Sequence, residues 1–169
     1  MNGSGWGVIF NTVGAVPRDP CQRSAGMFAP EEVDTASELA AAMAAWPGFE
    51  ATEPAPISDL AYPGVAITLV SAPRHEDCPA SHLFTTAESA PLDGYPMVNV
   101  QGRRHETEFR IFETEEGLLV VMAMNFPETP PYEENNGIPF DPKRHVEHQV
   151  EMEAILDSIE LKDPQGGAS

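Results

Sequence analysis

The feature that most constrains the fold is a pair of β-prone segments separated by a short turn sequence. Residues 108–112 alternate in part between polar and apolar side chains, whereas residues 118–126 are almost entirely apolar. The intervening residues 113–117 end in Gly117, which suits a left-handed turn position. We therefore predict a β-hairpin. The apolar second arm further predicts a central strand that is covered on both faces.

A helix is predicted before this hairpin, over residues 37–46. Thr35 and Glu38 form a capping box, in which the hydroxyl and the carboxylate satisfy backbone amides that the helix leaves unpaired. The run that follows is rich in alanine, the best helix former, and Pro47-Gly48 ends it. One apolar stripe is expected to face the core: Leu39, Met43 and Trp46.

A second helix is predicted from Asp141-Pro142 to about Glu160. Asp suits the N-cap position and Pro suits the first helical position. The preceding segment, Pro127–Asp141, is long and rich in Pro, Glu and Asn, which is typical of a functional or a disordered loop. The expected buried stripe of this helix consists of Met152, Ile155, Leu156 and Ile159.

The remaining β-prone segments fall mostly between the two helices. Strands grouped in this way indicate an α+β domain with an antiparallel sheet, rather than alternating β/α units. We expect a linker at residues 1–5, a single domain at 6–161 and a disordered tail at 162–169. The further strands are expected at residues 6–10, 49–57, 65–70 and 82–86.

The chain has two cysteines, Cys21 and Cys78, each beside a proline. An even count in a chain of this size indicates one disulfide, and a disulfide places the protein outside the reducing cytoplasm. The alternative is two unrelated buried thiols. The bridge would tie together two loops at one end of the sheet. Residues 1–5 have neither the basic start nor the apolar core of a signal peptide, so we expect a targeting or anchoring segment to be missing upstream.

The charge balance narrows the classes of partner. With 27 acidic residues against 9 basic ones, the net charge is −18. This argues against nucleic acid, whose phosphates need clustered Lys and Arg, and against docking on anionic lipid. No stretch approaches the roughly 18 apolar residues of a membrane span, so we expect no membrane insertion in this segment.

Several short motifs, taken in chain order, suggest a family. They are Gly5-Trp6-Gly7, Asp19-Pro20-Cys21, Trp46-Pro47-Gly48-Phe49, Tyr62-Pro63-Gly64, Cys78, the Phe109–Phe126 hairpin and Glu153–Ile159. The chain resembles a domain common in secreted and lipid-anchored actinobacterial proteins, and its hairpin and closing helix resemble the Mog1/PsbP-like α/β/α sandwich of mycobacterial lipoproteins. The resemblance implies a curved antiparallel sheet with an N-terminal-half helix and a C-terminal helix packed on it. It also places both cysteines where the family places its own, and it carries no catalytic residues to transfer. The segment Glu128–Asp141 departs from the family, whose members keep it short.

Four groups of residues are candidates, by residue type and spacing, for binding or chemistry. His145 and His148 lie three positions apart at the start of the last helix and share a face, so they could ligate a metal or serve a hydrolase; the alternative is a solvated first turn. Arg103, Arg104 and His105 form the only dense basic cluster and could clamp an anion, or they could pair with nearby acids. Tyr62, Tyr95 and Tyr132 lie in Pro/Gly turns and could line a groove or close the end of the sheet. The paired carboxylates Glu115-Glu116 are expected to be solvated turn residues.

These observations favour a non-enzymatic extracytoplasmic binding, sensing or scaffold domain without a cofactor or a metal. Its partner would be a small molecule or a protein, and the chain would be a monomer or a weak homodimer. We expect the ligand face to comprise Tyr95, Arg103, Arg104, His105 and Tyr132 with the segment Glu128–Asp141. One alternative is a hydrolase or metal-dependent enzyme that uses the His145/His148 region. A third hypothesis is strand addition along an exposed Phe109–Phe112 edge.

Overall fold

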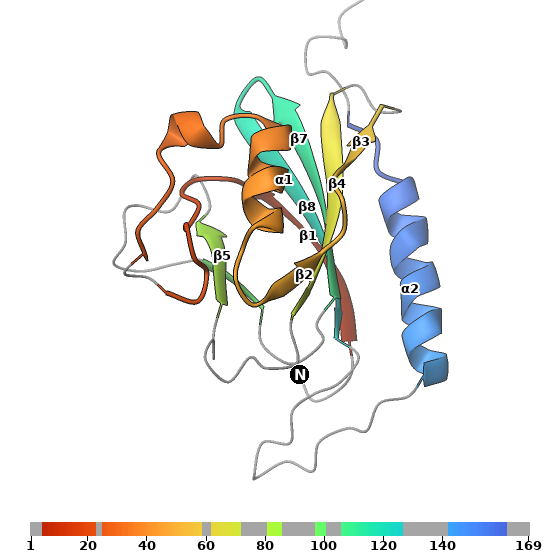
Figure 1. The fold of residues 1–169 in the computed structure, drawn as a ribbon. Helices are drawn as coiled ribbons and strands as arrows, with labels where there is room; N and C mark the ends of the chain where they lie inside the picture. The colour runs from red at the N-terminus through yellow and green to blue at the C-terminus, as the bar shows by residue number, and fades with distance from the viewer. Residues whose placement is uncertain are drawn as a thin grey trace, which may run out of the picture.

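The computed structural model describes residues 5–22, 25–58, 62–71, 81–85, 97–100, 106–126 and 142–161. A six-stranded antiparallel sheet forms the centre, in the order β1-β8-β7-β4-β2, with β3 also paired to β4. Two helices cover opposite faces of this sheet (Figure 1). The predicted α+β class with an antiparallel sheet is confirmed. The elements are β1 (Gly5–Thr12), η2 (Pro30–Glu32), α1 (Ala36–Ala44), β2 (Phe49–Ala51), β3 (Ala55–Ile57), β4 (Gly64–Ser71), β5 (Ser81–Thr85), β6 (Met97–Val100), β7 (Glu106–Thr114), β8 (Gly117–Phe126) and α2 (Pro142–Asp157).

The β7–β8 hairpin lies at the centre of the sheet, since β8 pairs with β1 and β7 pairs with β4. Thr114 pairs with Gly117, so the turn is tighter than the sequence predicts and consists of Glu115 and Glu116. Gly117 has a φ of 113°, a conformation that side chains disfavour. Successive residues Val120 and Val121 are both fully buried, one in each apolar cluster. The prediction of a central strand covered on both faces is therefore confirmed.

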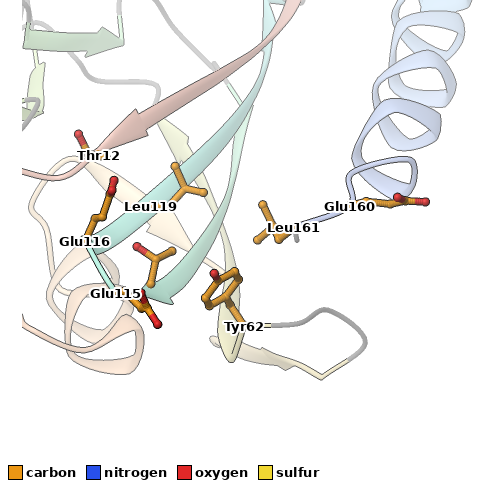
Figure 2. Close-up of a pocket in the computed structure, with 8 residues that line it drawn as sticks. Thr12, Tyr62, Glu115, Glu116, Leu119, Glu160 and Leu161 are labelled. Atoms are coloured by element: carbon orange, nitrogen blue, oxygen red, sulfur yellow. The ribbon is translucent and has the colours of Figure 1, made fainter. Parts of the chain in front are cut away.

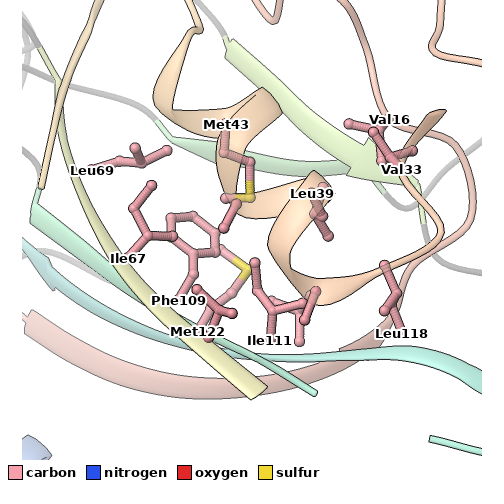
Figure 3. Packing of buried hydrophobic residues seen from close by; sticks show 14 of the residues in the cluster. Val16, Val33, Leu39, Met43, Ile67, Leu69, Phe109, Ile111, Leu118 and Met122 are labelled. Carbon is pink, nitrogen blue, oxygen red and sulfur yellow. The ribbon is translucent and has the colours of Figure 1, made fainter. Parts of the chain in front are cut away.

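The larger apolar cluster lies between α1 and the sheet. Leu39 and Met43 from the helix pack against Phe109 and Met122 from the two central strands, and all four side chains are fully buried (Figure 3). Trp46, which follows the helix, is also buried, and its indole Nε1–H donates to the Pro17 carbonyl at 3.0 Å. The predicted apolar stripe of this helix is confirmed.

The start of α1 is held by side chains from two parts of the chain. The Thr35 hydroxyl accepts from the Glu38 amide, and the Glu38 carboxylate accepts from the Thr35 amide, which confirms the predicted capping box. In addition, Glu113 at the end of β7 accepts from the Ala36 amide at 3.0 Å. The hairpin thus satisfies a helix amide that the local sequence leaves unpaired.

The second helix, α2, packs on the opposite face of the sheet. Met152 and Leu156 are buried against Phe112 and its neighbours, as predicted. Ile155 is 37% exposed, so its predicted burial is wrong. It lies about 100° around the helix from Leu156, and this turns it away from the sheet. The expected N-cap, Asp141, lies outside the described residues.

Arg110 in β7 fixes the end of α2. Its guanidinium donates to the Leu156 carbonyl at 3.1 Å and to the Glu108 carboxylate at 2.8 Å. The carbonyls of the last helical turn have no partner within the helix, and a cation satisfies them well. The helix ends at Asp157, three residues before the predicted Glu160.

The strand predicted over residues 49–57 is divided in two. β2 pairs with the end of β4 and β3 pairs with its start. Between them, Thr52 donates its amide to the Thr68 carbonyl at 3.0 Å and accepts from the Thr68 amide through its hydroxyl at 2.9 Å. The Thr52 hydroxyl thus accepts a hydrogen bond in place of a backbone carbonyl of the strand ladder. This happens close to Pro54, which has no amide hydrogen to donate. The predicted strand at 82–86 appears as β5, and it pairs with β6, which the sequence did not predict.

We predict that Gly64→Ala lowers the free energy of unfolding by about 1–3 kcal/mol, as for other overpacked interiors. A Cβ at Gly64 would lie 2.6 Å from Phe112 Cδ1 and 2.8 Å from the Ile111 carbonyl oxygen. Gly7→Ala is the matched control, because no heavy atom lies within 4 Å of the added Cβ. Urea denaturation measures both variants. Equal stability of the two would contradict the close packing of β4 against β7.

We predict that Asp34→Asn stabilises the protein at neutral pH. A hydrogen bond with Glu38, together with repulsion from that carboxylate, raises the pKa of Asp34 above its ordinary value. A raised carboxyl pKa favours folding at low pH, and this contribution is lost as the pH rises through the folded-state pKa. The variant should therefore gain stability at pH 7 and match the parent protein at about pH 3, where the Asp34 carboxyl is protonated and carries no more charge than the asparagine that replaces it.

Denaturant titrations at the two pH values test this expectation. Glu31→Gln, which removes another exposed carboxylate just before α1, controls for the change in net charge. A gain that persists unchanged at low pH would show that repulsion at Asp34 is not the cause.

Candidate functional site

The ligand face expected from the sequence lies outside the described residues. This applies to Tyr95, Arg103, Arg104, His105 and Tyr132, and to the segment Glu128–Asp141. Those residues therefore remain a hypothesis. The described part of the chain offers a different site.

A cavity of about 390 Å³ lies at the turn end of the β7–β8 hairpin. It opens on the face of the sheet that carries α2, because Leu119 at its floor belongs to the apolar cluster beneath that helix. Its volume falls within the range of small-molecule sites. The lining residues are Thr12, Tyr62, Thr114, Glu115, Glu116, Leu119, Glu160 and Leu161.

Three separate segments supply the apolar part of the cavity. Leu119 comes from β8, Tyr62 precedes β4, and Leu161 follows the end of α2. Figure 2 shows these three side chains directed towards one another around the open space. Thr12 is placed beside them because it is the β1 partner of Leu119. The sheet register and the early end of α2 therefore create the cavity.

The rim of the cavity is acidic. Glu115 and Glu116 form the hairpin turn, and Glu160 comes from the segment after α2. In Figure 2 the Glu116 side chain extends in the direction of Thr12, whereas that of Glu160 is directed away from the centre. None of the eight described lining residues is Lys, Arg or His. An apolar floor with a carboxylate rim suits a ligand that has an apolar body and a positive charge.

Part of this site is predictable from the sequence. Tyr62 is a candidate groove residue, and Glu115-Glu116 are predicted to be solvated, which agrees with their exposure. The structure brings the two groups together. Nothing in the sequence marks Thr12, Leu119 and Leu161 as site residues, and only the strand register and the position of α2 bring them together.

In the described part of the chain, no further residues join His145 and His148 in a metal-binding cluster. His148 is half-buried on α2, and the side chain of His145 lies outside the description. Among the residues that the structure describes, no three His, Cys, Asp or Glu side chains cluster in a way that could hold a metal ion. The hydrolase or metal-enzyme alternative stays an untested prediction.

Cys21 lies in a loop that crosses the molecule. The loop folds back on itself, with the Phe28 amide donating to the Val16 carbonyl at 2.9 Å. β1 ends at the opposite end of the sheet from the end of β4, because the two strands are antiparallel to each other. The loop nevertheless carries Cys21 to the far end, where its Sγ lies 3.8 Å from the Pro47 carbonyl oxygen. Phe49, two residues further on, pairs with Ser71.

In the structure Cys21 is disulfide-bonded. Cys78 lies outside the described residues, so its pairing with Cys21 stays a proposal. The geometry supports that pairing, since Cys21 lies near the point where the chain leaves β4 at Ser71, and Cys78 follows seven positions later. Seven residues can span roughly 24 Å.

Strand addition at Phe109–Phe112 would require an exposed edge there, and the structure has none at this strand. β7 has β8 on one side and β4 on the other, so both of its edges are occupied. This hypothesis is wrong for that strand, because a hairpin arm becomes an edge only when no later or earlier strand covers it. Neither helix in the described part of the chain has the length and apolarity needed to cross a membrane.

Comparisons with protein-family models, with curated proteins and with solved structures found no match to this chain. The resemblance to the Mog1/PsbP-like sandwich therefore stays a prediction. The candidate site rests on its own geometry.

We predict that the unfolded, unreduced protein contains no free thiol, because its two cysteines form one bridge. Thiol titration in denaturant, before and after reduction, measures this directly. Reduction should lower the free energy of unfolding by about 2–4 kcal/mol. The double variant Cys21→Ser/Cys78→Ser is the control, and a reductant should leave its stability unchanged. Two free thiols in the unreduced protein would refute the bridge.

Proposed function

We propose that the chain is a non-enzymatic, extracytoplasmic binding domain whose ligand occupies the cavity at the turn end of the β7–β8 hairpin. The observation that carries this proposal is the combination of an apolar floor and a carboxylate rim in one cavity of about 390 Å³. A volume of this size accepts a small molecule or one side chain of a partner. The disulfide at Cys21 supports the extracytoplasmic compartment, because such bonds persist in oxidising surroundings.

The ligand is a small organic cation with an apolar body. Leu119, Leu161 and the Tyr62 ring remove apolar surface from water. The carboxylates of Glu115 and Glu116, on a chain of net charge −18, attract a cation and repel an anion. An aromatic face also favours a nearby ammonium group.

Binding rather than turnover is favoured by the composition of the lining. Among the described residues, the cavity combines carboxylates and hydroxyls with no imidazole, amine or thiol to serve as a base or nucleophile beside them. Two of its glutamates, Glu115 and Glu116, are exposed on the hairpin turn rather than enclosed by the protein. Such carboxylates attract positive charge.

Three probes of similar size and different charge test the proposal: phenethylammonium, phenethyl alcohol and phenylacetate. We expect the cation to bind most tightly and the anion least, as measured by chemical-shift titration of the ¹⁵N-labelled protein. The shifts should concentrate on residues 114–119 and on Tyr62. Equal binding of cation and anion, or shifts confined to another surface, would contradict the proposed site.

A charge-removal variant sharpens the same experiment. Glu116→Gln should weaken binding of phenethylammonium about two- to fivefold, the usual contribution of an exposed ion pair. Glu53→Gln, which removes an exposed carboxylate between β2 and β3, is the matched control and should leave the affinity unchanged. Raising the salt concentration should reduce the difference between the two variants.

A further inference from the structure

The two outer edges of the sheet differ in how well they are protected against pairing with a further strand. On one side, β2 and β3 are three residues each, the segment between them contains Pro54, and Pro56 lies within β3. The exposed carboxylates of Glu50 and Glu53 lie along the same side. Short strands, prolines and charges are the devices by which natural sheets prevent edge pairing. This edge is therefore closed to a further strand.

The opposite edge, β1, has none of these devices. It runs for eight residues, Gly-Trp-Gly-Val-Ile-Phe-Asn-Thr, without a charge or a proline. Within the described residues it pairs with β8 alone. Ile9 is 38% exposed and Phe10 is 51% exposed, so apolar side chains on both faces of this strand reach solvent. A long, apolar, uncharged edge is a template for another strand.

We propose that β1 pairs antiparallel with β1 of a second copy of this chain, which joins the two sheets into one. In an antiparallel pair, residues directly opposite each other lie on the same face of the sheet. A two-fold arrangement centred on Ile9 places Ile9 opposite Ile9 on the face that carries α1. On the face that carries α2, it places Phe10 opposite Val8. The exposed apolar side chains of each copy then cover those of the other.

The distribution of charge makes this edge the surface where a second copy is repelled least. Each copy has a net charge of −18, so two copies repel each other over most of their surfaces. β1 is an uncharged stretch of eight residues, so pairing there brings no carboxylate into the ladder. A closed two-fold dimer is also the commonest assembly for identical chains. The contact is small and the long-range repulsion is strong, so the dimer is weak and tightens as salt screens the charge.

Sedimentation equilibrium from about 10 µM to about 1 mM protein, at low and high salt, tests the proposal over the range of a weak complex. We expect a monomer–dimer equilibrium whose dissociation constant falls as salt rises. Ile9→Lys should raise that constant about tenfold or more, because two ammonium groups would face each other across the two-fold axis. Val150→Lys is the matched control: Val150 is an exposed apolar residue on α2, 60% exposed, and its replacement should leave the dimer intact.

Hydrogen exchange of the unaltered protein supplies a second measurement that needs no variant. Amides within residues 5–12 should exchange more slowly at the higher protein concentration, whereas those of β2 and β3 should not change. A monomer at all concentrations and salt conditions would overturn the proposal. So would a dimer that survives Ile9→Lys in folded protein, or one that protects amides elsewhere, as an assembly through α2 would.

Discussion

The rest of the structure depends on the burial of β8 on both of its faces. A strand with Val120 and Val121 both removed from water needs an apolar layer on each side of the sheet, and α1 and α2 supply these layers. It also needs a paired strand along each edge, which β1 and β7 provide. The strands β1 and β4 and both helices are therefore placed by their relation to this one hairpin. Even the start of α1 is tied to it through Glu113, and the end of α2 through Arg110.

The candidate site follows from the same arrangement. α2 stops at Asp157, where Arg110 satisfies the carbonyl of Leu156, and the chain then passes over the turn end of the hairpin without covering it fully. Leu119 is left partly covered at the point where the helix no longer shields the strand. The tight turn places Glu115 and Glu116 at the rim. The apolar residues and the carboxylates of the site thus come from different segments, and the fold rather than the local sequence brings them together.

Particular residues show which features can be predicted from the sequence and which cannot. The capping box at Thr35 and Glu38 and the stripe of Leu39 and Met43 were predictable, because both depend on neighbours within one or two helical turns. Ile155 was assigned to the wrong side of α2, because the direction in which a helix faces the sheet is set by packing. The cavity residues Thr12 and Leu161 were missed, since they meet only through strand register and helix position. The hypothesis of strand addition required an exposed edge at Phe109–Phe112, but β4 pairs with this strand.

The sequence by itself determined the class of the fold, the hairpin and both helices, because periodicity, caps and turn residues act over a few positions along the chain. It also determined the strong negative charge and the presence of two cysteines. Only the tertiary structure decided that β1 is an edge of the sheet among the described residues, that the loop after β1 carries Cys21 across the molecule, and that Tyr62, Leu119 and Leu161 surround one cavity. These features depend on which strands become neighbours, and that choice is made by the burial of the whole sheet between two helices.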